Sequence, residues 1–150
     1  MSHAWSEDIV HVFILSGQSN MVGAGEVSSQ LSRNVGKGSL ECLTKNPVTA
    51  PHYRHLRNDD GSWKQRDDVQ ICFLDRRGSL QPGYGSTQNK IGPELGFGCC
   101  IGDAFDEPVL LIKIAWGGKS LAEDFRPPSL EGKTGLYYTK LLEQTEDVLR

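Results

Sequence analysis

The chain has 150 residues, of which 37% are hydrophobic and 23% are charged, and its formal net charge is -3. This length suits one domain with a buried core, so residues 1–150 are treated as a single domain. The negative charge argues against a general nucleic-acid-binding protein, which needs a basic face. No stretch approaches the roughly 18 apolar residues of a membrane span. Residues 1–10 lack a basic segment followed by an apolar run, so no secretory signal is predicted.

The four cysteines stand at positions 42, 72, 99 and 100 and form no Cys-x-x-Cys motif. Because unpaired cysteine is usually buried, we interpret all four as reduced, mostly buried thiols. Cys99 and Cys100 lie in a helical pattern, where neighbouring side chains point in different directions. Reduced thiols together with the missing signal favour a cytoplasmic location.

The first half of the chain contains one strong strand and two less regular regions. Residues 9–15, "IVHVFIL", are almost all apolar, which predicts a strand at the centre of a parallel sheet covered on both faces. Residues 23–51 are rich in Gly, Ser and Asn, and only short helical turns are expected there. In residues 57–75 the "NDDG" turn predicts a hairpin, with Val69, Ile71 and Phe73 on one face.

The second half reads as helix, strand and helix. "GPELGFGCCIGDAFDEP" predicts a helix from Pro93, with Glu94 at its positive end. Its internal glycines cost about 1 kcal/mol each, so they predict close packing on a strand. Residues 109–115, "VLLIKIA", predict a second buried strand, and residues 135–150 predict an amphipathic helix. The first helix is expected to bury a stripe that consists of Phe97, Cys100, Ile101, Ala104 and Phe105.

This order of elements predicts an α/β fold with a parallel sheet. In such a fold the last helix should lead into a further strand, and no residues remain for one.

Ser19 is the first candidate for chemistry. It lies in "SGQSN", four residues after Leu15, where a strand should turn into a loop or helix. Ligands bind beyond the carboxyl ends of parallel strands, and backbone N–H groups there can stabilise an oxyanion. The alternative is an ordinary capped turn, since Ser and Asn are favoured in turns. The lipase motif Gly-x-Ser-x-Gly is not met, because Met21 stands at the second glycine position.

"IAWGGKSL", residues 114–121, is the second candidate, because it too follows a buried strand and should reach the same edge as Ser19. Gly117 and Gly118 would allow a ligand to approach the backbone closely. "GGKS" is similar to the end of a phosphate-binding loop, but Lys113 stands where that motif requires its first glycine. A plain glycine turn is the alternative.

The histidines are His3, His11, His52 and His55. His11 lies in a predicted core strand and is interpreted as a packed residue. His52 and His55 are three residues apart, a spacing that could bind metal on a helix, but no third ligand is evident and surface positions are the simpler interpretation.

Three motifs occur in a familiar order: "ILSGQSNMVG", "IGPELGFG" and "LLIKIAWGGKSLAEDFRPP". Together they resemble the SGNH/GDSL hydrolase superfamily, specifically the sialate O-acetylesterase-like domain that includes carbohydrate esterase family six. The resemblance is weakest over residues 23–88, which we interpret as a variable insertion. It implies a flavodoxin-like, three-layer α/β/α fold with a parallel sheet of about five strands.

The resemblance also implies the chemistry: hydrolysis of O-acetyl esters on small molecules or glycans, without a metal or other cofactor. Ser19 would be the nucleophile, and its N–H with that of Gly117 or Gly118 would form part of the oxyanion hole. Gln18 and Asn20 would shape the turn and line the substrate pocket. Neither a nucleic acid nor a membrane is implied as a partner.

Such enzymes carry their catalytic histidine near the C-terminus as Asp-x-x-His. No Asp-x-x-His follows Ser19, and the last histidine is His55. Three explanations stand: a fragment of a longer esterase, a relative that only binds glycans, or a substitute base at His52 or His55. Loss of a triad base costs up to about 10⁶ in kcat, so little activity is expected if Arg150 is the natural end. Strands left unpaired at a sheet edge would also favour association.

Overall fold

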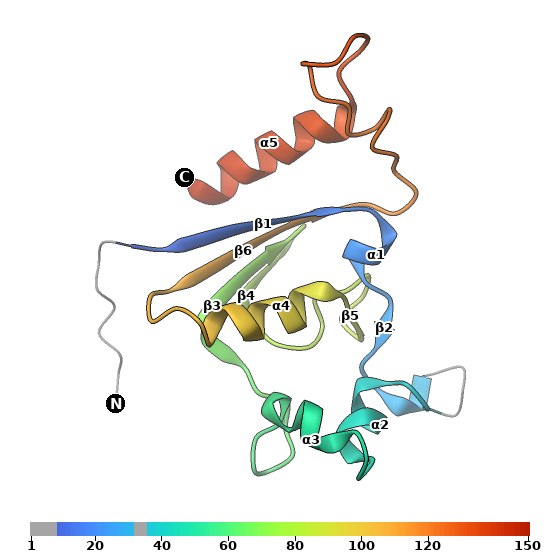
Figure 1. Cartoon of the computed structure of the whole chain (residues 1–150), viewed down its shortest axis with the longest axis vertical. Coiled ribbons are helices and arrows are strands. Elements are labelled where there is room, and N and C mark those ends of the chain that lie inside the picture. The colour runs from blue at the N-terminus through green and yellow to red at the C-terminus, as the bar shows by residue number, and fades with distance from the viewer. Residues whose placement is uncertain (1–8, 32–35) are drawn as a thin grey trace.

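The computed structural model describes residues 9–31 and 36–150. Its main sheet has the strand order β1-β6-β3-β4: β1 (His11–Gly17), β6 (Val109–Ala115), β3 (Arg66–Phe73) and β4 (Arg76–Leu80). The first three strands are parallel, and β4 is antiparallel to β3. Helix α4 (Pro93–Gly102) lies on one face and α5 (Leu136–Leu149) on the other (Figure 1). The predicted α/β/α layering is confirmed. Within the described residues the main sheet has four strands, whereas about five were expected.

The remaining elements are short. Between β1 and β3 lie α1 (Ser19–Val22), β2 (Gly25–Glu26), the 3-10 turn η1 (Ser29–Leu31), α2 (Leu40–Lys45), α3 (Ala50–Tyr53) and η2 (Arg54–Leu56). The strand β5 (Lys90–Ile91) pairs antiparallel with β2. The expected short helical turns in residues 23–51 are therefore present, and α2 and α3 lie at the end of the molecule opposite α5 (Figure 1).

Strand β6 is the centre of the sheet, as its apolar sequence predicts. It pairs with β1 on one side and with β3 on the other, so Phe13, Leu111 and Ile71 form one row across the sheet. Because side chains alternate along a strand, this row faces α4, whereas Ile112 and Ile114 face α5. The α4 face carries the main core, which includes Val69, Ile71, Phe73, Leu80, Leu95, Cys99, Val109 and Leu111.

The prediction that residues 9–15 form a central strand is wrong in position and extent. β1 begins at His11, and in the described part of the chain it pairs only with β6. Phe13 packs edge-on against Phe97 of α4. On the other face Val12 is 39% exposed and Ile14 is 47% exposed. Apolar residues on both faces of β1 therefore do not make it a central strand. Helix α5 lies over β6 and leaves Val12 and Ile14 of β1 exposed.

The predicted hairpin over residues 57–75 is also wrong. The "NDDG" segment does make a turn, but it closes only one bridge, between Arg57 and Trp63. The main hairpin is β3–β4, which turns at Leu74, a residue with φ of 55°. The alternation of Val69, Ile71 and Phe73 is correct, and these side chains are fully buried because β3 also pairs with β6.

Helix α4 confirms the predicted close packing at Gly98 but not at Gly96, which faces open space, and it corrects part of the predicted stripe. A Cβ at Gly98 would lie 2.3 Å from Cδ2 of Leu80, so the helix approaches the sheet where the side chain is missing. The buried side chains are Glu94, Leu95 and Cys99, while Cys100 is exposed. The helix also ends at Gly102, so the predicted positions Ala104 and Phe105 lie beyond it, but Phe97, Ile101 and Phe105 do pack against the core as predicted.

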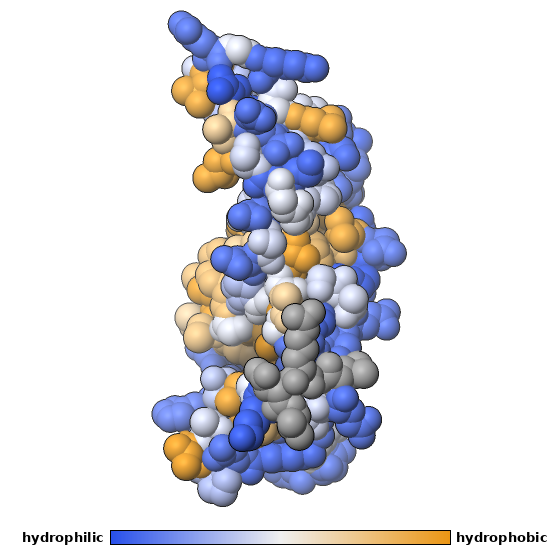
Figure 2. Space-filling model, turned by 90° about the vertical axis from the view of Figure 1, so that its right-hand side faces the viewer, coloured by the Kyte–Doolittle hydropathy of each residue, from blue (hydrophilic) through white to orange (hydrophobic). Residues whose placement is uncertain are grey.

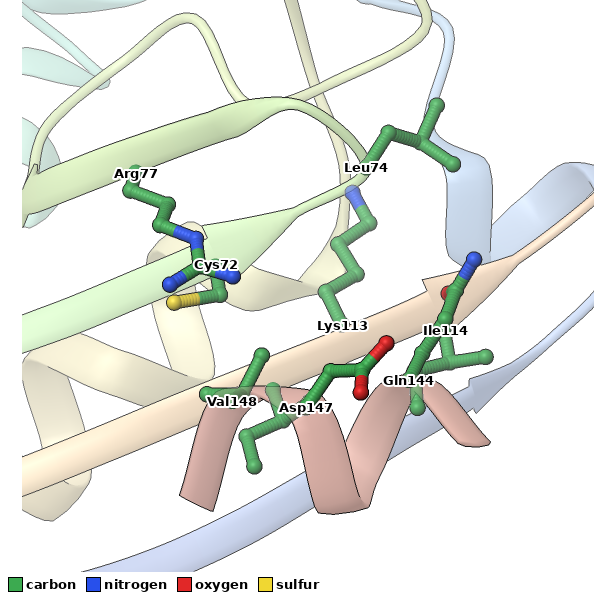
Figure 3. Close-up of a pocket in the computed structure, with 9 residues that line it drawn as sticks. Cys72, Leu74, Arg77, Lys113, Ile114, Gln144, Asp147 and Val148 are labelled. Atoms are coloured by element: carbon green, nitrogen blue, oxygen red, sulfur yellow. The ribbon is translucent and has the colours of Figure 1, made fainter. Parts of the chain in front are cut away.

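Helix α5 confirms the predicted amphipathic helix, but none of its residues is buried. A hollow of about 140 Å³ lies between this helix and the sheet. Figure 3 shows Gln144, Asp147 and Val148 of α5 on one side of it and Cys72 and Arg77 on the other. The contact between α5 and the sheet is therefore looser than that of α4.

All four cysteines are free, as predicted, but only Cys99 is buried. Within the described ranges, no helix combines the length and apolarity that crossing a membrane requires. Figure 2 shows the side of the molecule on which α1 lies. Hydrophilic residues prevail at both ends of this side, and hydrophobic residues gather in its middle.

Candidate active site

Ser19 lies at the carboxyl end of β1, where the sequence predicts it. The strand ends at Gly17, and Ser19 is the first residue of α1, a helix of a single turn. The serine is exposed. A Cβ on Gly17 would lie 2.8 Å from Cβ of Met21, so the tight reversal from strand to helix requires glycine at that position.

The neighbouring Gln18 caps this turn with its side chain. Its Oε1 accepts hydrogen bonds from the backbone N–H of Ser19 at 3.0 Å and from the Ser19 hydroxyl at 2.9 Å. Gln18, which the resemblance places in the substrate pocket, therefore binds both the hydroxyl and the backbone N–H of Ser19. An acyl-transfer nucleophile would use these two groups. Asn20, the other predicted pocket residue, is exposed beside it.

Gly117 and Gly118 reach the same end of the sheet as Ser19. Ala115, the last residue of β6, pairs with Gly17 in the parallel register. The N–H of Trp116 then donates to the carbonyl of Gly17 at 3.3 Å. Both glycines are exposed, and Gly118 has φ of 71°, a conformation that favours glycine. The two motifs thus meet at one sheet edge, as expected.

The "GGKS" segment continues into contacts with acidic and aromatic groups. Lys119 lies 3.5 Å from Asp124 and over the ring of Tyr137. The N–H of Ser120 donates to the same carboxylate at 2.9 Å. A phosphate-binding loop presents its lysine and backbone N–H groups to a phosphate. Here the side chain of Lys119 and the N–H of Ser120 contact the carboxylate of Asp124 instead.

Sequence reasoning missed a buried ion pair beneath the site. Lys113 of β6 donates to Oε2 of Glu94 at 2.6 Å, and the side chains are 0% and 1% exposed. Glu94 was expected only to favour the positive end of α4. Two signals in the sequence indicate the pair: a lysine within the apolar run "VLLIKIA", and a glutamate directly after the proline that starts α4. Burial lowers the pKa of Lys113.

The described histidines do not reach Ser19. His11 stands at the other end of β1, where its ring stacks on Phe105 with centroids 3.9 Å apart and its Nε2 lies 3.3 Å from Glu107. Asp8 and His11 have the Asp-x-x-His spacing, but they precede Ser19, and Asp8 lies outside the described residues. His3 lies outside them as well.

His52 and His55 are exposed on α3 and η2, at the end of the molecule that holds α2. The structure therefore does not bring either candidate for a substitute base to Ser19. In the part of the chain that the structure describes, the Ser19 hydroxyl has one hydrogen-bond partner, Gln18. The described residues also contain no group of three or more His, Cys, Asp or Glu side chains that could hold a metal ion.

Comparisons with known proteins bear on the family and the fold of this chain. The family model described as carbohydrate esterase, sialic acid-specific acetylesterase, matches residues 9–150. No curated protein sequence matches the chain. The crystal structure of a protein from Arabidopsis thaliana superposes with a TM-score of 0.55 at 18% identity, over 92% of this chain. The chain spans 50% of that structure's length, and at this identity the likeness shows the fold alone.

Proposed function

The chain belongs to the carbohydrate esterase family of sialic acid-specific acetylesterases, and from that membership we propose that Ser19 removes O-acetyl groups from carbohydrates. The observation that carries the proposal is the position of Ser19. It is an exposed hydroxyl at the carboxyl end of β1, at the same sheet edge as the exposed backbone of Gly117 and Gly118.

In the proposed reaction, Oγ of Ser19 attacks the carbonyl carbon of the acetyl ester while a base takes its proton. The tetrahedral intermediate collapses, the bond from the carbonyl carbon to the sugar oxygen breaks, and that oxygen leaves with a proton. Water then attacks the acetyl-serine, which releases acetate and restores the hydroxyl. No metal takes part in these steps.

The backbone N–H groups of Ser19 and of Gly117 or Gly118 would stabilise the oxyanion. One such donor contributes about 3–4 kcal/mol to the transition state. Because Oε1 of Gln18 accepts from the N–H of Ser19, this side chain has to turn away when substrate arrives. Gln18 and Asn20 would then line the pocket, and the hydroxyl of Ser19 would be free for its base.

The base is the part of the site that the described residues do not supply. The chain spans half the length of the solved structure it resembles. We therefore assign the complete reaction to a polypeptide that carries these 150 residues together with an Asp-x-x-His block. The 150-residue chain alone should show little turnover, because a triad that lacks its base loses up to about 10⁶ in kcat.

Labelling with an activated organophosphonate tests the nucleophile. We expect mass spectrometry of the intact protein and of its peptides to show one adduct at Ser19, formed slowly because no base in the described residues reaches the hydroxyl. The change Ser19→Ala should abolish the adduct, whereas Ser16→Ala should keep it, since Ser16 is an exposed serine three residues away, in β1. The label should form faster in a longer polypeptide that carries the Asp-x-x-His block.

Absence of the adduct in both polypeptides would refute the esterase proposal. Saturable binding of an acetylated sugar that survives Ser19→Ala, without an adduct, would instead identify a glycan-binding relative of the same fold.

A further inference from the structure

The turn that carries Ser19 has little packing of its own. Helix α1 has four residues and none of them is buried. A single helical turn is unstable in isolation, because its nucleation cost exceeds the gain from its few hydrogen bonds. Two such bonds close it: the N–H of Val22 donates to Gln18 at 2.9 Å, and that of Gly23 donates to Ser19 at 3.0 Å. Its position must therefore come from tertiary contacts.

Lys113 supplies the contact at the end of this turn. Its ammonium group can donate three hydrogen bonds, and all three are made: to the carbonyl of Val22 at 2.9 Å, to the carbonyl of Tyr84 at 2.7 Å and to Glu94 at 2.6 Å. Figure 3 shows its side chain leaving β6 on the face opposite α5. One buried cation thus joins the nucleophile turn, the segment before β5 and the start of α4.

Glu94 fixes the other side of this junction. Its second oxygen accepts from the N–H of Gly92 at 2.8 Å. A Cβ on Gly23 would lie 2.4 Å from Cα of Gly92, so the backbone after α1 touches the backbone before α4. The N–H of Ser86 also donates to the carbonyl of Gly23 at 2.9 Å. The pair and the two glycines therefore clamp the C-terminal end of α1.

The same strand holds the other end of the turn. Trp116, three residues after Lys113, donates its N–H to the carbonyl of Gly17, two residues before Ser19. The next residues are Gly117 and Gly118. Strand β6 and the residue directly after it thus contact the nucleophile turn at both ends, and the chain continues into the segment proposed to stabilise the oxyanion.

We propose that Lys113 and Glu94 form a positioning pair that holds Ser19 in place relative to the Gly117–Gly118 backbone. The role of Ser19 as a nucleophile rests on the proposed function, whereas the clamp on α1 is testable without it. The pair touches no substrate and acts through the carbonyl of Val22 and the N–H of Gly92.

Amide hydrogen exchange in the unaltered protein is the first test. Helix α3 has the same length as α1, and the N–H of Arg54 closes it by donating to Ala50. After correction for intrinsic rates, we expect the N–H of Gly23 to exchange at least about 10-fold more slowly than that of Arg54. Equal exchange at the two positions would show that α1 is not clamped and would overturn the proposal.

Variants of the pair separate positioning from stability. Lys113→Met removes the bond to Val22 and leaves Glu94 unpaired, whereas the double variant Lys113→Met, Glu94→Gln leaves no buried charge. Replacing both partners of a buried pair often restores stability. We expect the double variant to unfold near the temperature of the unaltered protein, yet to exchange Val22 and Gly23 at least about 10-fold faster and to label Ser19 at least about 10-fold more slowly.

Lys45→Met is the matched control, because Lys45 pairs with Glu41 at an exposed position on α2. It should change neither the exchange at α1 nor the labelling of Ser19. If the double variant keeps both at the unaltered rates, the pair is only structural and the proposal is wrong. If Ser19 is never labelled but exchange at α1 rises in the variants, the proposed function fails and the clamp stands.

Discussion

The two faces of the sheet differ in how tightly a helix covers them. On the α4 face, Leu111 and Ile71 are fully buried, and the helix approaches closely at Gly98. On the α5 face, Ile112 and Ile114 of β6 are buried as well, but a hollow of about 140 Å³ lies between the helix and the strands, and Ile14 of β1 is 47% exposed. Helix α5 is amphipathic in sequence and nevertheless packs more loosely than α4, so a pattern of apolar residues alone does not determine how well a helix packs.

The difference matters for the site, because the nucleophile turn depends on the α4 face. The clamp on α1 is built from Lys113, Glu94 and Gly92, all of which lie at the start of α4 or on the strand surface that it covers. The more tightly packed side of the sheet thus holds the turn that carries the proposed nucleophile, as a preorganised site requires. Three measurements test the contrast between the two faces.

The largest difference is expected in thiol labelling. Cys72 lines the hollow on the α5 face, whereas Cys99 is 6% exposed on the α4 face. Burial raises the pKa of both thiols, so access and not ionisation should separate them. In a time course with iodoacetamide followed by peptide mapping, Cys72 should react at least about 100-fold faster than Cys99. This ratio corresponds to roughly 2.7 kcal/mol of additional opening free energy for Cys99.

The exposed Cys100 should react first and calibrates the reagent in the same sample. Equal rates for Cys72 and Cys99 would mean that the two faces open together, and the contrast in packing would be wrong.

An effect of similar size in free energy is expected from two matched isoleucine truncations. Ile71→Ala removes a fully buried side chain between β3 and α4, which should lower the free energy of unfolding by about 2–5 kcal/mol. Ile14→Ala removes a half-exposed side chain on the α5 face, which should cost less than about 1 kcal/mol. Urea unfolding followed by circular dichroism measures both. A cost at Ile14 as large as that at Ile71 would contradict the contrast.

The smallest effect, and one with opposite signs, is expected from two glycines of α4. A Cβ at Gly98 would lie 2.3 Å from Leu80 and 2.9 Å from Leu111, so Gly98→Ala should cost about 1–3 kcal/mol. Gly96 faces open space, so Gly96→Ala should stabilise the protein by about 0.5–1 kcal/mol through its higher helix propensity. Thermal unfolding shows the sign of each change. Destabilisation by both would mean that α4 does not depend on a close approach at Gly98.

Several features follow from the sequence because they depend on neighbouring residues. The run "VLLIKIA" predicts β6 with its observed bounds, since a short apolar stretch between Pro and Gly is typical of a buried strand. Ser19 and Gly117 each stand just after an apolar strand, and parallel strands end at the same edge of a sheet. The sequence by itself therefore determines the α/β class, the family resemblance and the meeting of the two motifs.

Tertiary structure decides the features that depend on distant residues. An apolar strand such as β1 can stand at the centre or at the end of a sheet, and only its partners settle which. The pairing of β3 with β6 likewise overrides the local "NDDG" turn signal. Lys113 meets the carbonyl of Val22 across 91 residues of chain. No local sequence pattern predicts such a bond. Burial of the Lys113 charge is favourable only once three separate segments have come together around it.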